Sequence, residues 1–158
     1  MKSSSKALLG LAALLLLAVV TVVLLRAPAV PDQTQIVQQM ETARAAGERH
    51  DISGFMAVVS PHYHDSNVPS PVQLRFLLNR MQGNGPISVT QTVPVVDVHG
   101  DDATTTNHLR IASADGRVLY DHDITLQWKR EDGTRFGVLP TKVWRITTAD
   151  YGSPFGDF

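Results

Sequence analysis

The sequence predicts an α+β domain, because segments with helical periodicity come first and segments with strand periodicity follow. Between residues 32 and 82, apolar side chains recur every three to four positions. After Pro86 the period changes to two. Strands joined in series by turns pair antiparallel, and one face of such a sheet needs a cover. We therefore expect three helices packed on a strongly curved sheet of about four strands, forming a cone with an internal pocket.

Each predicted helix has its own start signal. Asp32 is the expected N-cap of a first amphipathic helix of about four turns. Asp51 is the expected cap of a shorter helix at residues 52–60, which Pro61 ends. The third helix, at residues 71–82, follows Ser70, with a proline at its first position and a glutamine three residues after the cap.

Four strands are expected, at residues 87–100, 103–113, 117–130 and 141–152. Pro94 lacks an amide donor, so the first strand is bulged or lies at a sheet edge there. The runs GDDA at 100–103, Ala114–Gly116 and Glu131–Thr134 have turn chemistry. Residues 135–140 are expected to form an irregular insert that extends the last hairpin or folds over its end.

The amino-terminal segment is too apolar for a soluble core. Residues 7–25 carry no charged side chain, and a helix of that length spans the hydrocarbon layer of about 30 Å. A signal peptide usually has a shorter apolar stretch of roughly 7–15 residues, so we favour a retained anchor at 1–26 over cleavage and secretion. Lys2 and Lys6 outweigh Arg26, which predicts a cytoplasmic amino terminus and an extracytoplasmic domain in a single-pass membrane protein.

The remaining chain has the length of one domain. Residues 27–31 form a proline-containing linker, residues 32–152 the domain, and residues 153–158 a tail. The chain of 158 residues has no cysteine, so its fold depends on its own core. Its formal net charge is −1 and no long basic run follows Lys6, which argues against nucleic acid as a partner. No cofactor motif is present, so no cofactor is expected.

The run SPHYHD at residues 60–65 raises three alternatives: a catalytic cluster, a metal site or a pocket rim. His62 and His64 are two apart and could ligate a metal together, with Asp65, His50 or His122 as a third ligand. Nothing in the sequence fixes those distances, and we expect no metal. Asp121 and Asp123 share one strand face, where we expect solvent rather than acid–base chemistry.

Asp65 has a structural alternative to a chemical role. Its carboxylate can accept the backbone N–H groups of Asn67 or Val68 as an Asx turn. The ring of Tyr63 would then pack at the mouth of the pocket. This alternative makes the run a pocket rim, and we favour it.

The order of these elements resembles the nuclear transport factor 2-like superfamily, which includes ketosteroid isomerase, scytalone dehydratase, polyketide cyclases and many non-catalytic domains. The resemblance covers residues 32–152. It rests on element order, on the short helix before SPHYHDS, on the GDDA turn and on Trp144-Arg145 in the last strand. It implies a pocket between helices and sheet, and it implies dimerisation through the outer face of the sheet.

The resemblance also implies which residues to consider at the pocket. In ketosteroid-isomerase-like members the general base is an aspartate just after the second helix, and Asp65 occupies a comparable place. The isomerase takes an oxyanion donor from a tyrosine on the first helix, which is absent here; Tyr63 is the substitute candidate. We expect a small apolar ligand to be bound by Phe55, Val59, Tyr63, Phe76, Trp128 and Trp144. The two tryptophans are also expected to pack in or across the sheet.

Two functions therefore compete. The favoured one is a membrane-anchored, non-catalytic domain that binds a small apolar ligand or a protein partner. The alternative is a cofactor-free isomerase, lyase or cyclase with Asp65 as general base and Tyr63 as donor. The missing oxyanion donor on the first helix favours the first.

Overall fold

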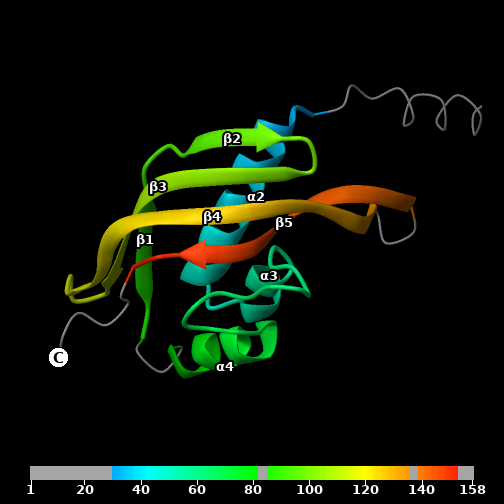
Figure 1. The fold of residues 1–158 in the computed structure, drawn as a ribbon. Helices are drawn as coiled ribbons and strands as arrows, with labels where there is room; N and C mark the ends of the chain where they lie inside the picture. Colours follow the sequence, from blue (N-terminus) through cyan, green and yellow to red (C-terminus); the bar gives the residue numbers. More distant parts are fainter. Residues whose placement is uncertain (1–29, 82–84, 136–138, 153–158) are drawn as a thin grey trace, which may run out of the picture. The chain divides into compact units, whose positions relative to one another are not determined.

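A curved antiparallel sheet of five strands packs against helix α2 in the computed structural model, which describes residues 30–81, 85–135 and 139–152. The elements are α2 (Asp32–Glu48), α3 (Ile52–Met56), α4 (Pro71–Met81), β1 (Ile87–Gln91), β2 (Val95–His99), β3 (Asp102–Ser113), β4 (Val118–Arg135) and β5 (Leu139–Asp150). The strand order is β1-β3-β4-β5, and β2 also pairs with β3. Figure 1 shows α2 crossing one face of the sheet, with α3 and α4 below the carboxyl-terminal end of α2 in this view. The predicted α+β class and the curved sheet are confirmed.

The sheet has one strand more than the sequence predicted. Residues 92–94 interrupt the first predicted strand, and the pieces on either side, β1 and β2, both pair with β3. Gln91 lies opposite Leu109 and Val95 opposite Thr106. Pro94 cannot donate a ladder hydrogen bond, which explains why the chain leaves and rejoins β3 here. The predicted edge position is confirmed, and the count of four strands is wrong.

The predicted turn at Glu131–Thr134 is also wrong. These residues continue β4 and pair with β5, with Glu131 opposite Val143 and Gly133 opposite Thr141. A Cβ atom at Gly133 would lie 2.8 Å from Val143 Cγ2, so the glycine serves close packing between the strands. Residues 135 and 139–140 belong to the two strands, so the predicted insert extends the hairpin as far as it is described. Residues 136–138 lie outside the described residues.

Two predicted helix caps are confirmed. The Asp51 side chain accepts a hydrogen bond of 2.8 Å from Gly54 N, and Ser70 Oγ accepts one of 3.3 Å from Gln73 N. The second helix is shorter than predicted, because it ends at Met56. The chain then forms an isolated bridge between Val59 and Ile146 of β5.

Asp32 does not cap α2, which corrects the sequence prediction. It lies in the first turn, and Pro31 holds the N-cap position without a side-chain hydrogen bond. Asp32 Oδ1 instead accepts a hydrogen bond of 3.3 Å from Trp144 Nε1 and pairs with Arg130. The Arg130 guanidinium lies 4.9 Å from the centre of the Trp144 ring, within cation–π range. The start of α2 is thereby fixed to β4 and β5.

The other end of α2 is fixed to β1. Glu48 Oε1 accepts a hydrogen bond of 3.0 Å from Val89 N, and Arg44 donates one of 3.4 Å to Val89 O. Between the two ends, Ile36 and Met40 are buried against the sheet. Trp128 and Trp144 are each 1% exposed, and burying about 200 Å² of such a side chain stabilises by about 5 kcal/mol before conformational entropy is subtracted.

The predicted anchor at 1–26, linker residues 27–29 and the tail at 153–158 lie outside the described residues. Within the described ranges, no helix combines the length and the apolar character needed to cross a membrane.

A histidine on the outer face of the sheet lies between two carboxylates. His108 Nδ1 is 2.9 Å from Asp123 Oδ1, its cross-strand partner, and His108 Nε2 is 2.7 Å from Asp121 Oδ1. Hydrogen bonds to Asp123 and Asp121 raise the pKa of His108. Asp121 and Asp123 are thus exposed to solvent, as expected. Their contact with His108 was not predicted from the sequence.

Replacing both carboxylates, with Asp121→Asn and Asp123→Asn, should bring the pKa of His108 down toward the ordinary value of about 6.5. The pKa of His108 is raised in the folded protein, so its protonated ring stabilises the fold most fully below the pKa that it has in the unfolded chain. This stabilisation is lost as the pH rises through the pKa of His108 in the folded protein. An NMR titration of the imidazole protons in wild type and double variant measures this. An unchanged His108 pKa in the double variant would show that the two carboxylates do not hold the proton.

Candidate functional site

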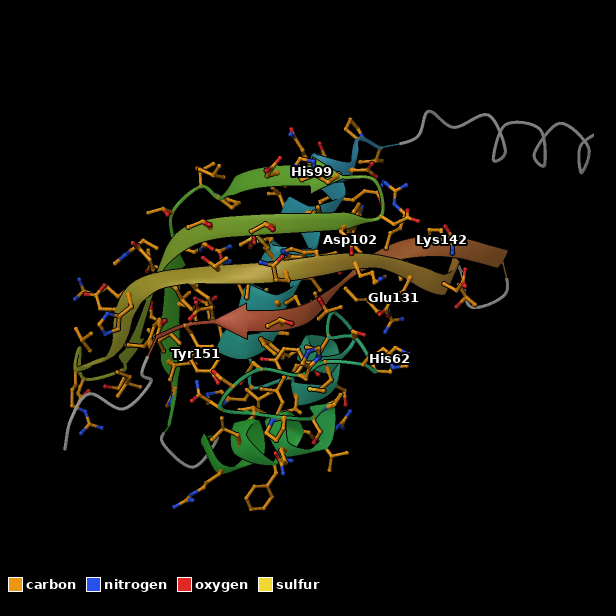
Figure 2. The ribbon with its side chains drawn as sticks, viewed as in Figure 1. His62, His99, Asp102, Glu131, Lys142 and Tyr151 are labelled. Atoms are coloured by element: carbon orange, nitrogen blue, oxygen red, sulfur yellow. The ribbon has the colours of Figure 1, made fainter. Side chains whose placement is uncertain are left out.

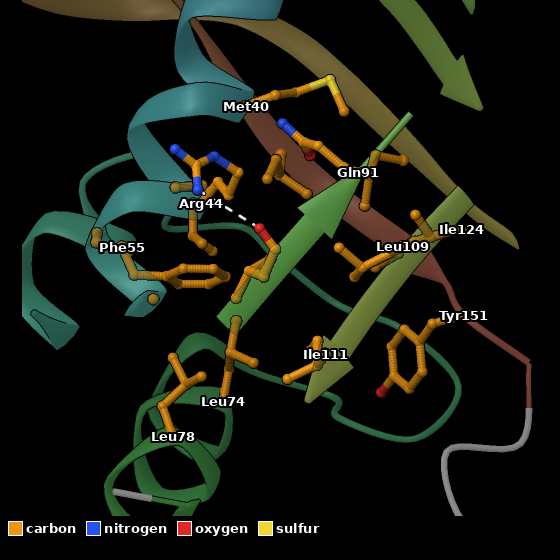
Figure 3. A pocket seen from close by; sticks show the side chains of 18 of the residues that line it. Met40, Arg44, Phe55, Leu74, Leu78, Gln91, Leu109, Ile111, Ile124 and Tyr151 are labelled. Carbon is orange, nitrogen blue, oxygen red and sulfur yellow. Dashed lines mark hydrogen bonds between the residues drawn. The ribbon is translucent and has the colours of Figure 1, made fainter. Parts of the chain in front are cut away.

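A cavity of about 320 Å³ lies between the helices and the concave face of the sheet (Figure 3). Its wall comes from α2, α3 and α4, from every strand except β2, from the connection between α2 and α3, and from the residues after α3 and β5. The size is at the lower end of the roughly 300–1,000 Å³ that is typical of small-molecule sites. The side chains that line it are mostly apolar and include Met40, Ala43, Phe55, Val59, Leu74, Leu78, Ile87, Val89, Leu109, Ile111, Ile124, Leu126 and Ile146.

Strand alternation explains why the floor of the cavity is apolar. Residues two apart on β3 point to one face, and Leu109 and Ile111 line the cavity while His108 and Arg110 face solvent. Ile124 on β4 lies two residues from Leu126, and both line the cavity.

Small residues on α2 explain why the space is open. Ala43, Ala46 and Gly47 all line the cavity, and a Cβ atom at Gly47 would meet nothing within 4 Å. Gly47 follows Met40 and Ala43 on the same helical face, at spacings of seven and four residues. Larger side chains at these positions would fill the space between helix and sheet.

Two charged side chains of the described residues line the cavity, Arg44 and Asp51, and both have partners. Asp51 accepts from Gly54 N. Arg44 donates to Glu41 at 2.8 and 2.6 Å and to Glu48 at 2.7 Å (Figure 3 shows its further bond to the β1 backbone). Two carboxylates thus compensate one guanidinium, which leaves little charge to attract an anionic ligand.

Two tyrosine hydroxyls at the wall are directed to one carboxylate outside it. Tyr63 and Tyr151 line the cavity, and both hydroxyls donate to Asp65, with Tyr151 Oη at 3.4 Å from Oδ2. Burial, and then the hydrogen bond to Asp65, raises the pKa of Tyr63. Burial and the charge of Asp65 raise the pKa of Tyr151. Both phenols therefore stay neutral at physiological pH.

Asp65 has a structural role in this arrangement. Its Oδ1 accepts hydrogen bonds of 2.6 Å from Asn67 N and from Val68 N, which is the expected Asx turn. Asp65 is not among the residues that line the cavity. Of the two candidate catalytic residues, Tyr63 lies at the cavity and Asp65 supports the loop behind it.

The structure divides the predicted ligand-binding residues into two groups. Phe55, Val59 and Tyr63 line the cavity. Phe76 does not, because it is 70% exposed, away from the face of α4 that carries Leu74 and Leu78. Trp128 and Trp144 are buried in the core, where Trp128 Nε1 donates a hydrogen bond of 3.0 Å to Thr105 Oγ1, and neither lines the cavity.

Sequence reasoning missed Asn107, Gly47 and Tyr151, all of which line the cavity. The alternation of side chains along β3 could have identified Asn107, because Asn107 lies on the same face of the strand as Leu109 and Ile111. Gly47 shares a helical face with Met40 and Ala43, but nothing in the sequence shows that this face leaves a space. Tyr151 falls within the strand predicted at 141–152, but β5 ends at Asp150, so strand parity does not predict the direction of its side chain.

The two histidines of the SPHYHD run lie at the surface. His62 points outward from the loop between α3 and α4 (Figure 2), and His64 Nδ1 is 3.3 Å from His62 O. In the part of the chain that the structure describes, no group of three or more His, Asp or Glu side chains could hold a metal ion.

Solved structures with the same fold place the chain in a structural class. A nuclear transport factor 2-like protein of unknown function from Pseudomonas putida KT2440 matches with a TM-score of 0.64 and 18% identity, over 78% of this chain and 87% of that one. A protein of unknown function with a cystatin-like fold from Nostoc punctiforme matches at 0.60 and 11%, over 75% and 87%. A nuclear transport factor 2-like protein with a cystatin-like fold from Novosphingobium aromaticivorans matches at 0.57 and 14%, over 75% and 79%.

These likenesses show that the chain has the nuclear transport factor 2-like, cystatin-like fold. No protein-family model and no curated protein matches the sequence. The fold hosts many functions, so the function has to be argued from the site.

Replacing Asp65 with Asn should destabilise the domain by about 1–2 kcal/mol, because the amide cannot accept from both tyrosine hydroxyls and both backbone N–H groups as the carboxylate does. Thermal unfolding measures the loss. The control is Asp132→Asn, whose side chain is 90% exposed and whose ion pair should contribute little. Equal melting temperatures for the two variants would show that Asp65 does not support the loop.

Proposed function

We propose that the domain binds a small, neutral, largely apolar molecule in the cavity between α2 and the sheet. The observation that carries this is the lining itself: side chains such as Leu109, Ile111 and Ile124 surround a space of about 320 Å³. Burying apolar surface there contributes roughly 25 cal/mol for each Å² removed from water. The paired state of Arg44 supports a neutral ligand over an anionic one.

The proposed role is binding without catalysis. The carboxylate suggested as a general base, Asp65, accepts hydrogen bonds from Asn67, Val68 and Tyr63 and lies outside the lining. A base has to reach the proton that it abstracts. The tyrosine hydroxyls are directed to the same carboxylate, so neither serves as a free donor for a developing oxyanion.

The apolar segment at 7–25 supports a further part of the proposal, that the domain is held at a membrane with residues 27–158 on the extracytoplasmic side. Fractionation and protease protection of the full chain test this. Pairing of two copies through the outer face of the sheet stays a prediction, for which analytical ultracentrifugation of the full chain is the direct measurement.

Filling the cavity from α2 should abolish binding without loss of stability. Gly47→Phe places a ring where a Cβ atom meets nothing within 4 Å, whereas Gly47→Ala adds one methyl group to the same position. Both changes remove a glycine from a helix, which stabilises by up to about 1 kcal/mol. Titration of the methyl-labelled full chain with 2-methylnaphthalene should therefore shift the Leu109 signals in wild type and Gly47→Ala, but not in Gly47→Phe.

All three proteins are titrated in the same detergent micelles, so that partitioning of the probe is the same for each. The methyl signals of Val95, which is 73% exposed and absent from the lining, provide the internal reference. Saturable shifts in Gly47→Phe as large as those in Gly47→Ala would contradict binding in this cavity.

A further inference from the structure

One buried residue in the wall of the cavity has a side-chain oxygen without a partner among the described residues. Asn107 lies on β3, is 5% exposed and lines the cavity. Its Oδ1 is buried and accepts no hydrogen bond, and its Nδ2 makes one marginal bond of 3.5 Å to the neighbouring His108 O. A buried acceptor without a donor is unfavourable, and native structures contain few of them.

The neighbours of Asn107 in the sheet offer no hydrogen-bond donor to its Oδ1. The residues that share its face on β3 are apolar or satisfied: Leu109 and Ile111 have no polar atoms to pair, and Thr105 Oγ1 accepts from Trp128. Opposite Asn107 on β4 is Ile124, which offers no donor. The strand neighbours therefore supply nothing that the amide oxygen could bind.

We infer that Asn107 is the specificity-determining residue of the cavity, and that its side-chain oxygen accepts a hydrogen bond from a hydroxyl or N–H group of the ligand. This inference rests on the proposed binding of a neutral, apolar molecule and narrows it to one that carries such a donor. The terminal torsion of an asparagine is soft, so the amide can turn toward a ligand at little cost. The surrounding apolar wall makes the hydrogen bond stronger than it would be in water.

The cavity wall has other polar side chains besides Asn107. Asp51 accepts from Gly54 N, and Gln91 and His50 also line the cavity. Arg44 is bound to Glu41 and Glu48, and the hydroxyls of Tyr63 and Tyr151 donate to Asp65. Among the lining residues that the structure describes, Asn107 is the one with a buried side-chain acceptor that has no donor. A ligand without a donor would leave that atom unpaired on binding, which is how a buried polar group rejects an analogue.

The test compares two probes of the same shape, 2-naphthol, which has a hydroxyl donor, and 2-methylnaphthalene, which has a methyl group instead. Affinities are measured by titration of the full chain in detergent micelles, for wild type and for Asn107→Leu. For each protein, the affinity for 2-naphthol is divided by the affinity for 2-methylnaphthalene. The wild-type ratio is then divided by the variant ratio, and in this quotient the partitioning of each probe into the micelle cancels. We expect this quotient to be roughly ten in favour of 2-naphthol, the effect of about one hydrogen bond.

Asn79→Leu is the matched control, because it makes the same chemical change at an exposed position of α4 outside the cavity. It should leave the quotient at one relative to wild type. Asn107→Leu should also melt at a higher temperature than wild type without ligand, because it removes the unpaired acceptor.

The outcomes separate this inference from the proposed function. If both probes bind and Asn107→Leu leaves their ratio unchanged, the inference falls and the proposed function stands. If neither probe binds wild type, both fall. Should Asn107→Leu not fold, the side-chain amide signals of wild type decide: a shift of the Asn107 signals with 2-naphthol only supports the inference, and equal shifts with both probes overturn it.

Discussion

The fixing of α2 at both of its ends is the constraint on which the cavity depends. At its first turn, Asp32 pairs with Arg130 and accepts from Trp144, which ties the helix to β4 and β5. At its last turn, Glu48 accepts from Val89 N, which ties it to β1. The helix therefore crosses the concave face between strands that lie far apart in the sheet order. A helix held in this way cannot move down onto the sheet to close a gap beneath it.

The residues between the two attachments decide where the gap lies. Toward the start of α2, Ile36 and Met40 fill the space against the sheet. Toward its end, Ala43, Ala46 and Gly47 do not. Leaving apolar surface unpacked forfeits dispersion contacts and stability, by about 24 cal/mol for each Å³ of cavity in one well-studied protein. An apolar ligand would restore those contacts, so the same residues that lower stability define the site.

The sequence contained enough to predict the class of the fold, because helical and strand periodicities report directly on which faces are buried. The edge position at Pro94 and the caps at Asp51 and Ser70 followed from local chemistry, whereas the division of the strand into β1 and β2 did not. Local chemistry failed where pairing across strands outweighed it, as at Glu131–Thr134, which continues β4 despite its turn-like residues. It failed again at Asp32, because its partners lie about a hundred residues away in the sequence.

The site was less predictable than the fold for a physical reason. Strand parity predicts which residues of β3 share a face with Leu109, but not which of them meet the cavity and which meet the core. Thr105 and Asn107 have the same parity, and only the structure shows that Trp128 satisfies the first while the second stays unpaired. Asp65 illustrates the converse, since its family-like position suggested a base and its hydrogen bonds show a support for the loop.

Xenon binding tests the central claim most directly, because xenon occupies stable apolar cavities and needs no specific polar contact. A crystal of the protein under xenon pressure should show the atom between α2 and the sheet, in contact with Ala43 on one side and Leu109 on the other. A well-ordered structure in which no xenon enters, and in which side chains fill the space between those two residues, would contradict the account.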